Sequence, residues 1–101
     1  KMDEPILRKM SAMSIFAISV FDDSIKSLYK KDYSLADAVV AKTKTIASME
    51  NEAIKAMSKK VEAAEMSTAR IIMESIRRTA EYASDIAEIV LNLNVSQIIE
   101  V

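Results

Sequence analysis

The side chains best suited to bind an ion or a charged partner gather in the C-terminal third of the chain. Glu81, Asp85 and Glu88 follow one another at intervals of four and three residues. A helix would place them along one face. Carboxylate oxygens are the ligands that hard cations prefer, so Fe, Mn or Mg would be candidate ions. The spacing therefore predicts a metal site built from these three acids.

The same stretch has a simpler interpretation as a solvated charged face. Glu74, Arg77 and Arg78 precede the acids at helical spacing, and pairs such as Glu74–Arg78 and Arg77–Glu81 would stabilise it. Such a stripe could also contact a charged partner. We predict no enzyme, because the chain has no Cys and no His, which excludes a thiol nucleophile and a Ser-His-Asp triad.

Composition bounds the fold class. The chain has 101 residues, enough for one domain with a core. It has no Gly and one Pro, which disfavours β-hairpins and excludes a Gly-rich phosphate loop. A net charge of −1 gives no basic surface for direct nucleic-acid contact. The longest uncharged stretch, 10–21, is too short for a membrane span, so we expect a soluble, cytoplasmic protein.

Apolar residues recur every three or four positions and predict an all-α, antiparallel three-helix bundle. The helices are expected at about 4–30, 34–63 and 67–93. Ser34 with Asp37 resembles a capping box that opens the second helix. The expected inward residues of the first helix are Ile6, Met10, Met13, Ala17, Val20, Ser24 and Leu28. Those of the second helix are Leu35, Val39, Ile46, Met49, Ala53, Met57 and Val61, with Lys42 on the same face.

The expected inward residues of the third helix are Ala69, Ile72, Ile76, Thr79, Ala83, Ile86, Val90 and Leu93. This stripe is displaced by about 100° from an extension of the second one. A continuous helix would therefore turn Arg78 and Asp85 into the core. We predict a turn between Glu62 and Ser67, with Ser67 or Thr68 as the new N-cap.

The first helix carries more apolar residues than one inward stripe requires. Ile15, Phe16, Ile18 and Phe21 make it apolar nearly all round. One interpretation is that the bundle covers this helix completely. The other is an oligomer interface centred on these residues, because monomers seldom expose such a patch.

The run RRTAEYASDIAEIVLN, from Arg77 to Asn92, resembles the signature segment of PhoU domains, the phosphate-uptake regulator family. The signature reads approximately as acid-Arg-x-x-Asp-[His/Tyr]-Ala-x-[Asn/Asp]-Ile-Ala-Glu. The matching residues are Arg78, Tyr82, Ala83, Asp85, Ile86, Ala87 and Glu88. KKDYSLADAVV, from Lys31 to Val40, is similar to the connection that opens the family's second helix.

The resemblance implies a regulatory module that controls phosphate transport or signalling through protein contacts. Its partner would be the ATPase of a phosphate ABC transporter or a sensor kinase. Some family members hold iron or zinc clusters, which adds Zn to the candidate ions. Here Arg77 stands where the family's metal motif has an acid, and Glu81 where it has Asp. Both changes weaken that motif.

The resemblance also implies a second architecture. Family members pair two three-helix repeats, so a single repeat spanning 1–101 predicts a homodimer. The opening Lys1-Met2 does not resemble a natural start, so we expect the repeat to be a fragment of a longer chain. PhoU-like regions of archaeal type are similar to those that follow a small AbrB-type DNA-binding domain. The alternative function is therefore a structural dimerisation or sensor domain attached to a DNA-binding domain in a transcriptional regulator.

Overall fold

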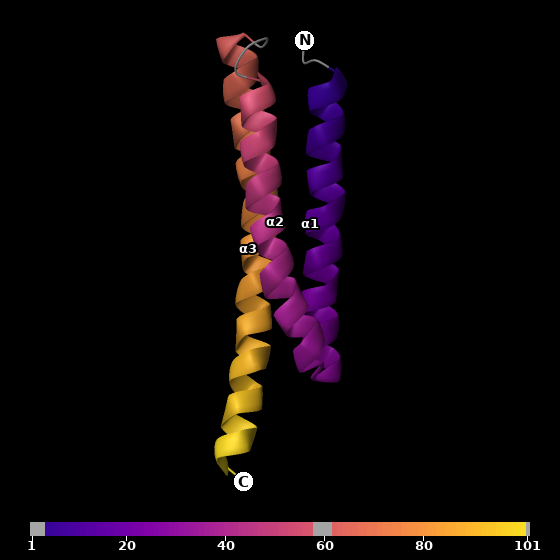
Figure 1. Cartoon of the computed structure of the whole chain (residues 1–101), viewed down its shortest axis with the longest axis vertical. Helices are drawn as coiled ribbons and strands as arrows, with labels where there is room; N and C mark the ends of the chain where they lie inside the picture. The colour runs from indigo at the N-terminus through magenta and orange to yellow at the C-terminus, as the bar shows by residue number, and fades with distance from the viewer. Residues whose placement is uncertain (1–3, 58–61, 101) are drawn as a thin grey trace.

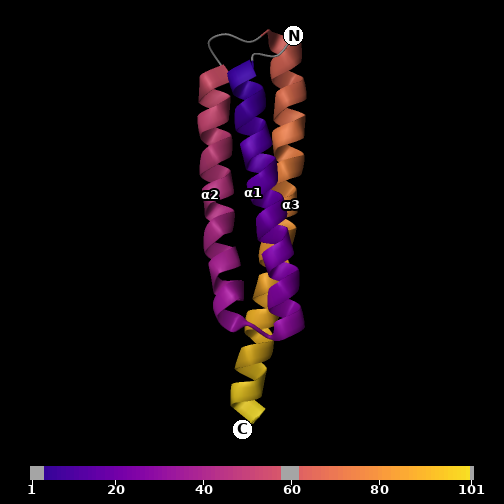
Figure 2. The same ribbon diagram turned by 90° about the vertical axis from the view of Figure 1, so that its right-hand side faces the viewer.

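Three long helices run antiparallel and side by side along their length. The structure, a computed structural model, describes residues 4–57 and 62–100, with side chains described up to position 93. The helices are α1 (Glu4–Lys30), α2 (Tyr33–Met57) and α3 (Ala63–Glu100), and each contacts both others. Figures 1 and 2 show α3 continuing past the turn that joins α1 to α2. The predicted all-α three-helix bundle is confirmed.

The α1–α2 connection is tight although the chain has no Gly. Lys31 adopts a left-handed backbone conformation with φ 51°. The amide of Asp32 donates to the Ser27 carbonyl (2.9 Å) and that of Lys31 to the Leu28 carbonyl (3.4 Å). This is a Schellman motif, in which Gly normally occupies the left-handed position. The motif ends α1 and reverses the chain within two residues.

Asp32 also caps α2. Its Oδ1 accepts a hydrogen bond from the amide of Leu35 (3.0 Å), which satisfies a first-turn donor that has no partner within the helix. The predicted capping box of Ser34 and Asp37 is therefore wrong, because Ser34 already lies within the helix. The second helix begins one residue earlier than predicted.

The boundary between α2 and α3 lies earlier than the spacing predicts. α2 ends at Met57 rather than near residue 63, and α3 begins at Ala63 rather than near 67. The Glu62 carbonyl accepts the first helical bond, from Met66 (2.9 Å). Ser67 and Thr68 lie inside α3, so neither is its N-cap. The predicted inward Val61 lies outside the described residues.

The predicted end of the third helix near residue 93 is also wrong. α3 runs on to Glu100 through Asn92 and Asn94. Asn is a weak helix breaker compared with Gly or Pro, and neither of those follows it here. α3 is 38 residues long and sets the 59 Å length of the molecule.

The core along α1 follows the predicted stripe except at its end. Six of the seven predicted residues are buried, but Ser27 takes the place of Leu28, which is 43% exposed. Ser24 and Ser27 are fully buried, and each hydroxyl donates to a backbone carbonyl three residues earlier. Both hydroxyls are thereby satisfied, so they allow close helix contact without an unpaired polar group.

The cores along α2 and α3 agree with the predicted stripes in part. On α2 the predicted Val39, Ile46, Ala53 and Met57 are buried. α2 also buries Ala36 and Glu50, whereas the predicted Leu35 and Met49 are half-buried. On α3 the predicted Ala69, Ala83 and Val90 are buried, and so are Met73, Ala80 and Ala87, which the sequence did not predict. The predicted Ile72 and Leu93 are 40% and 46% exposed. Alanines inside allow the helix axes to approach closely, which larger residues would prevent.

Candidate functional site

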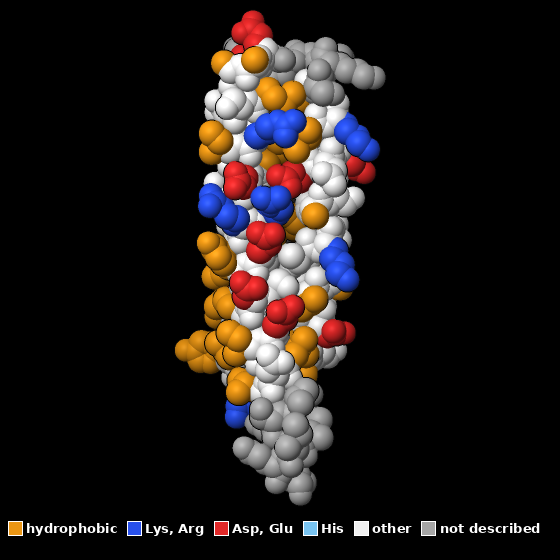
Figure 3. Space-filling model, turned by 90° about the vertical axis from the view of Figure 1, so that its left-hand side faces the viewer, with side chains coloured by type: hydrophobic (Ala, Val, Ile, Leu, Met, Phe, Trp, Pro, Cys, Tyr) orange, Lys and Arg blue, Asp and Glu red, His pale blue; other side chains and the backbone are white. Residues whose placement is uncertain are grey.

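The charged residues of α3 face a surface groove against α2, here called the charged groove. One part has a volume of about 310 Å³, and its lining residues are Val40, Thr43, Lys44, Ala47, Arg77, Glu81, Ser84 and Glu88. The other part has a volume of about 490 Å³, and its lining residues are Thr43, Arg78, Glu81, Tyr82, Ser84 and Asp85. Figure 3 shows charged side chains of both signs along the middle of this face.

Small side chains make this groove. Thr43 lines both parts of the groove, and its hydroxyl oxygen is 3.0 Å from the Val39 carbonyl oxygen and 3.3 Å from the Ala80 carbonyl oxygen. The second contact joins α2 to α3. Ala47 and Ser84 leave space on either side of it. The groove therefore exists because short residues face each other where the two helices are close.

A cross-helix ion pair lies beside the charged groove, because Arg77 lines the smaller part of the groove. An Nη of Arg77 lies 3.5 Å from a carboxylate oxygen of Glu50 on α2. Glu50 is buried, with a relative exposure of 9%. The Nε of Arg77 is also buried and has no hydrogen-bond partner among the described residues. Arg77 therefore forms an ion pair inside the bundle. The sequence analysis placed Arg77 on the surface as a contact residue and did not predict its pair with Glu50.

The other members of the predicted stripe lie on the surface. Glu74, Arg78 and Glu81 are exposed, and among the described residues neither Glu74–Arg78 nor Arg77–Glu81 forms an ion pair. Arg77 was expected to pair with Glu81 one turn along the same helix. It pairs instead with Glu50 of α2. Glu74 lies with Arg70 beside Glu50, whereas Arg78 and Glu81 border the charged groove.

The three candidate metal ligands share α3 but not one pocket. Glu81 and Asp85 line the larger part of the charged groove, and Glu88 lines the smaller part with Glu81. Within the described ranges no three acidic side chains come close enough to hold a metal ion. Arg78 borders the same space and would repel a cation. One copy of the chain thus offers two carboxylates rather than a complete ligand set, and metal binding stays a prediction.

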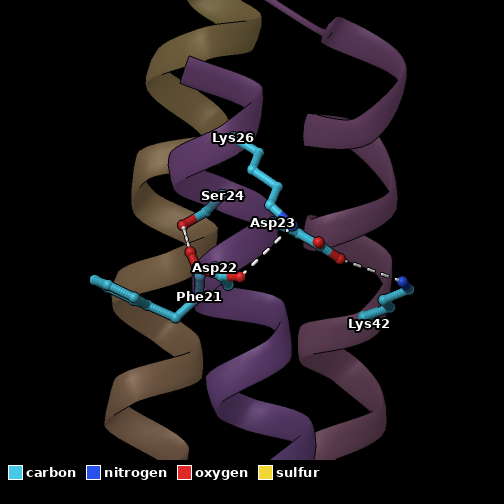
Figure 4. Close-up of polar contacts among 6 residues, drawn as sticks. All are labelled: Phe21, Asp22, Asp23, Ser24, Lys26 and Lys42. Atoms are coloured by element: carbon cyan, nitrogen blue, oxygen red, sulfur yellow. Dashed lines mark hydrogen bonds and ion pairs between the residues drawn. The ribbon is translucent and has the colours of Figure 1, made fainter. Parts of the chain in front are cut away.

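The α1–α2 side also carries charges, which pair across the helices. Asp23 of α1 reaches toward Lys42 of α2, with 3.7 Å between oxygen and nitrogen, and Asp22 pairs with Lys26 along α1 (3.6 Å). Figure 4 shows these contacts, and it shows Phe21 extending on the side of α3. The half-buried Lys42 keeps its stem against the bundle, as the sequence predicts.

The third side of the bundle, between α1 and α3, presents an uncharged surface, here called the apolar face. Two stripes spaced alternately three and four residues apart form it, and neither contains a charged residue. The α1 stripe consists of Leu7, Ser11, Ser14, Ile18, Phe21, Ile25 and Leu28. The α3 stripe consists of Ile72, Ser75, Thr79, Tyr82, Ile86, Ile89 and Leu93. All these residues are half-buried or exposed.

The predicted interface residues divide between the interior and this face. Phe16 is half-buried and packs against both core clusters of the bundle, and Phe21 packs against the cluster around Val20 and Ala83. Ile15 and Ile18 are exposed, at 67% and 62%. The sequence therefore located apolar surface on α1, but it did not distinguish Phe16, which joins the two clusters, from Ile18, which faces outward.

The fold and these surfaces define a small helical module that offers the charged groove and the apolar face for contacts with other molecules. The chain matches the family model of the PhoU domain over residues 10–90. It therefore belongs to the PhoU domain family, as the signature run predicted. This is a family of regulatory helical domains rather than enzymes.

No curated protein and no solved structure matches the chain. None of the helices in the described part of the chain has the length and apolar content needed to cross a lipid bilayer.

Proposed function

We propose that this chain is a regulatory module that controls phosphate uptake or phosphate signalling by binding a protein partner through the charged groove. The observation that carries the proposal is the groove itself, where Lys44 of α2 and Glu81 of α3 line one depression in a PhoU domain. Charges of both signs in one groove favour a partner with a complementary pattern and disfavour others. The proposed partner is the ATPase of a phosphate ABC transporter or a phosphate-responsive sensor kinase, and the proposed location is the cytoplasm.

The proposal is tested by capturing each purified partner on the immobilised chain. Glu81→Lys and Lys44→Glu reverse the two charges that line the groove from α3 and α2. We expect each to weaken binding by about tenfold, mostly through the association rate and in a salt-dependent way. Asp37→Lys is the matched control, because Asp37 is exposed on α2 and does not line the groove. The proposal would be contradicted if neither partner binds, or if all three charge reversals leave the affinity unchanged.

A second candidate function is favoured by the apolar face. We propose that the chain pairs with a second copy, and such a dimer would also suit a dimerisation or sensor domain attached to a DNA-binding domain. The same capture experiment separates the two candidates. Partner binding that survives disruption of the dimer supports the regulatory module. A stable dimer that captures neither the ATPase nor the kinase supports the dimerisation domain.

A further inference from the structure

We infer that the charged groove binds one α-helix of a partner protein, which lies parallel to α3 and has an acidic N-terminal half and a basic C-terminal half. The inference rests on the proposed function, because it describes the partner segment for that same groove. It follows from three features of the surface between α2 and α3: its length, the uncharged residues that line it from α2, and the unequal distribution of charge along α3.

The depressed surface between α2 and α3 is long enough for a helix. Beside the charged groove lies a further depression of about 380 Å³, which Ile54 of α2 and Arg70 of α3 line. Arg77 lines both this depression and the smaller part of the charged groove, so the two adjoin. The lining residues of α3 therefore extend from Arg70 to Glu88, a helical distance of about 27 Å. A partner helix of about five turns matches this length.

The uncharged residues that line this surface from α2 include an apolar series. Val40, Ala47 and Ile54 lie seven residues apart. Val40 and Ile54 are half-buried against the core clusters, whereas Ala47 is exposed and small. A seven-residue apolar repeat is the pattern through which helices pack side by side. An extended segment would instead need unpaired backbone groups at a sheet edge, which two helices do not offer. The surface therefore suits a helical partner.

Acidic side chains gather at one end of this surface, here called the acidic end. Glu81, Asp85 and Glu88 line it from α3, and Figure 3 shows acidic side chains in succession along this face. None of the three forms an ion pair with another described residue. Lys44 of α2 lines the same end and offsets one of these charges. The acidic end therefore attracts basic side chains of a partner.

The opposite end, here called the basic end, has a smaller excess of positive charge. Arg70 and Glu74 line it from α3, and the exposed Arg78 follows one turn after Glu74. Glu50 and Arg77 line it as well, but they lie 3.5 Å apart as an ion pair and offset each other. The two exposed arginines thus exceed the one exposed acid, so this end favours an acidic side chain of the partner.

The direction of the partner helix follows from helix dipoles. Charge complementarity places the basic half of the partner at the acidic end, and a helix running in either direction could satisfy it. α2 and α3 are antiparallel, so their dipoles oppose each other and give little preference. The partner's own dipole is best satisfied by acids near its N-terminus and bases near its C-terminus. Its C-terminus therefore lies at the acidic end, and the helix runs parallel to α3.

Two synthetic peptides of about 18 residues test the inference. Both are held helical by a side-chain cross-link and have Leu and Ala on the side toward the groove. The forward peptide has Glu in its N-terminal half and Lys in its C-terminal half, and the mixed peptide has the same residues alternating. By fluorescence anisotropy the forward peptide should bind about tenfold more tightly at low salt, with a smaller difference at high salt. Equal affinities, or no binding of either peptide, would overturn the inference.

Variants of the chain test where the forward peptide binds. Glu88→Lys should weaken its binding by about threefold to tenfold. Glu52→Lys is the matched control, because Glu52 is an exposed acid of α2 that faces α1 instead. Ala47→Phe should weaken binding by more than about tenfold, since the ring occupies space that the helix needs. Ala41→Phe, at an exposed Ala of α2 outside the groove, should have little effect.

Circular dichroism checks that each variant keeps its helices. If neither Glu88→Lys nor Ala47→Phe weakens the binding of the forward peptide, the peptide binds elsewhere and the inference is wrong.

Disulfide trapping tests the direction, because the chain has no Cys of its own. Val40→Cys places a thiol at the acidic end and Asn51→Cys places one at the basic end. A forward peptide with Cys at its C-terminus should couple to Val40→Cys and not to Asn51→Cys, and one with Cys at its N-terminus should do the reverse. The opposite pairing, or equal coupling at both ends, would contradict a helix that lies parallel to α3.

Two outcomes separate this inference from the proposed function. If the transporter ATPase or the sensor kinase binds and Glu81→Lys weakens that binding, but the forward peptide does not bind, the inference is wrong and the proposed function stands. If the forward peptide binds as expected but neither protein does, the groove accepts such a helix and the proposed function is wrong.

Discussion

The guanidinium of Arg77 on α3 lies 3.5 Å from the carboxylate of Glu50 on α2, and Glu50 is the charged residue that the described part of the bundle buries. A buried carboxylate without a partner loses its hydration and gains nothing in return. The contact therefore constrains how α2 and α3 pack beside the charged groove. It also removes Arg77 from the residues free to meet a partner.

Replacement of Arg77 by Ala should destabilise the chain by about 1–3 kcal/mol, less than for a fully buried pair because Arg77 is partly exposed. The expected measurement is the free energy of unfolding from urea titration. Arg78→Ala, at an exposed neighbour, is the control and should change stability by less than about 0.5 kcal/mol. If Arg77→Ala and Arg78→Ala lower the free energy of unfolding equally, the contact between Arg77 and Glu50 contributes nothing to stability.

Lys31→Gly should stabilise the protein by about 1 kcal/mol. Lys31 holds a left-handed conformation (φ 51°) that costs a residue with a Cβ atom about 1–2 kcal/mol, whereas Gly adopts it freely. Gly also loses more backbone entropy on folding, which offsets part of the gain. Thermal unfolding should show a higher midpoint for Lys31→Gly. Lys30→Gly, one residue earlier and inside α1, should lower it.

Phe16→Ala should destabilise the bundle by about 2–4 kcal/mol, since Phe16 packs against both core clusters and its removal leaves a cavity between them. Ile15→Ala, at an exposed neighbour, should cost less than about 1 kcal/mol in the monomer. Unfolding measured below the dimer dissociation constant separates this effect from association. Equal losses for the two variants would place Phe16 outside the core.

Cation binding at Glu81 and Asp85 should be weak. The two carboxylates line one pocket with Arg78, and two acidic ligands next to a fixed positive charge make a poor site for Mn, Fe, Zn or Mg. Isothermal titration should give a dissociation constant of about millimolar or weaker, comparable to weak calcium modules. Asp85→Asn should abolish that binding, whereas Glu88→Gln should affect it less because Glu88 lines the neighbouring pocket. Micromolar binding would indicate additional ligands.

Local signals in the sequence determined the class of fold and most of the first helix. Alternation of apolar residues along residues 4–30 identified six buried positions of α1, because one stripe dominates the inward side there. The absence of Gly, Cys and His excluded whole classes of chemistry, since those classes require particular atoms. The signature run from Arg77 to Asn92 pointed to the PhoU family, which the family match then established.

Tertiary packing decided what lies inside along α3. The sequence offers two neighbouring stripes there, and hydrophobicity favours the one with Ile72, Ile86 and Leu93. The bundle buries Ala83 of that stripe as predicted, but it also buries Met73, Ala80 and Ala87 in place of the larger residues, and small side chains let neighbouring helices pack closely. The bulkier stripe is left on the apolar face. Periodicity can show that α3 has an apolar side, but only the distance between helix axes decides which part of that side becomes core and which remains as a docking surface.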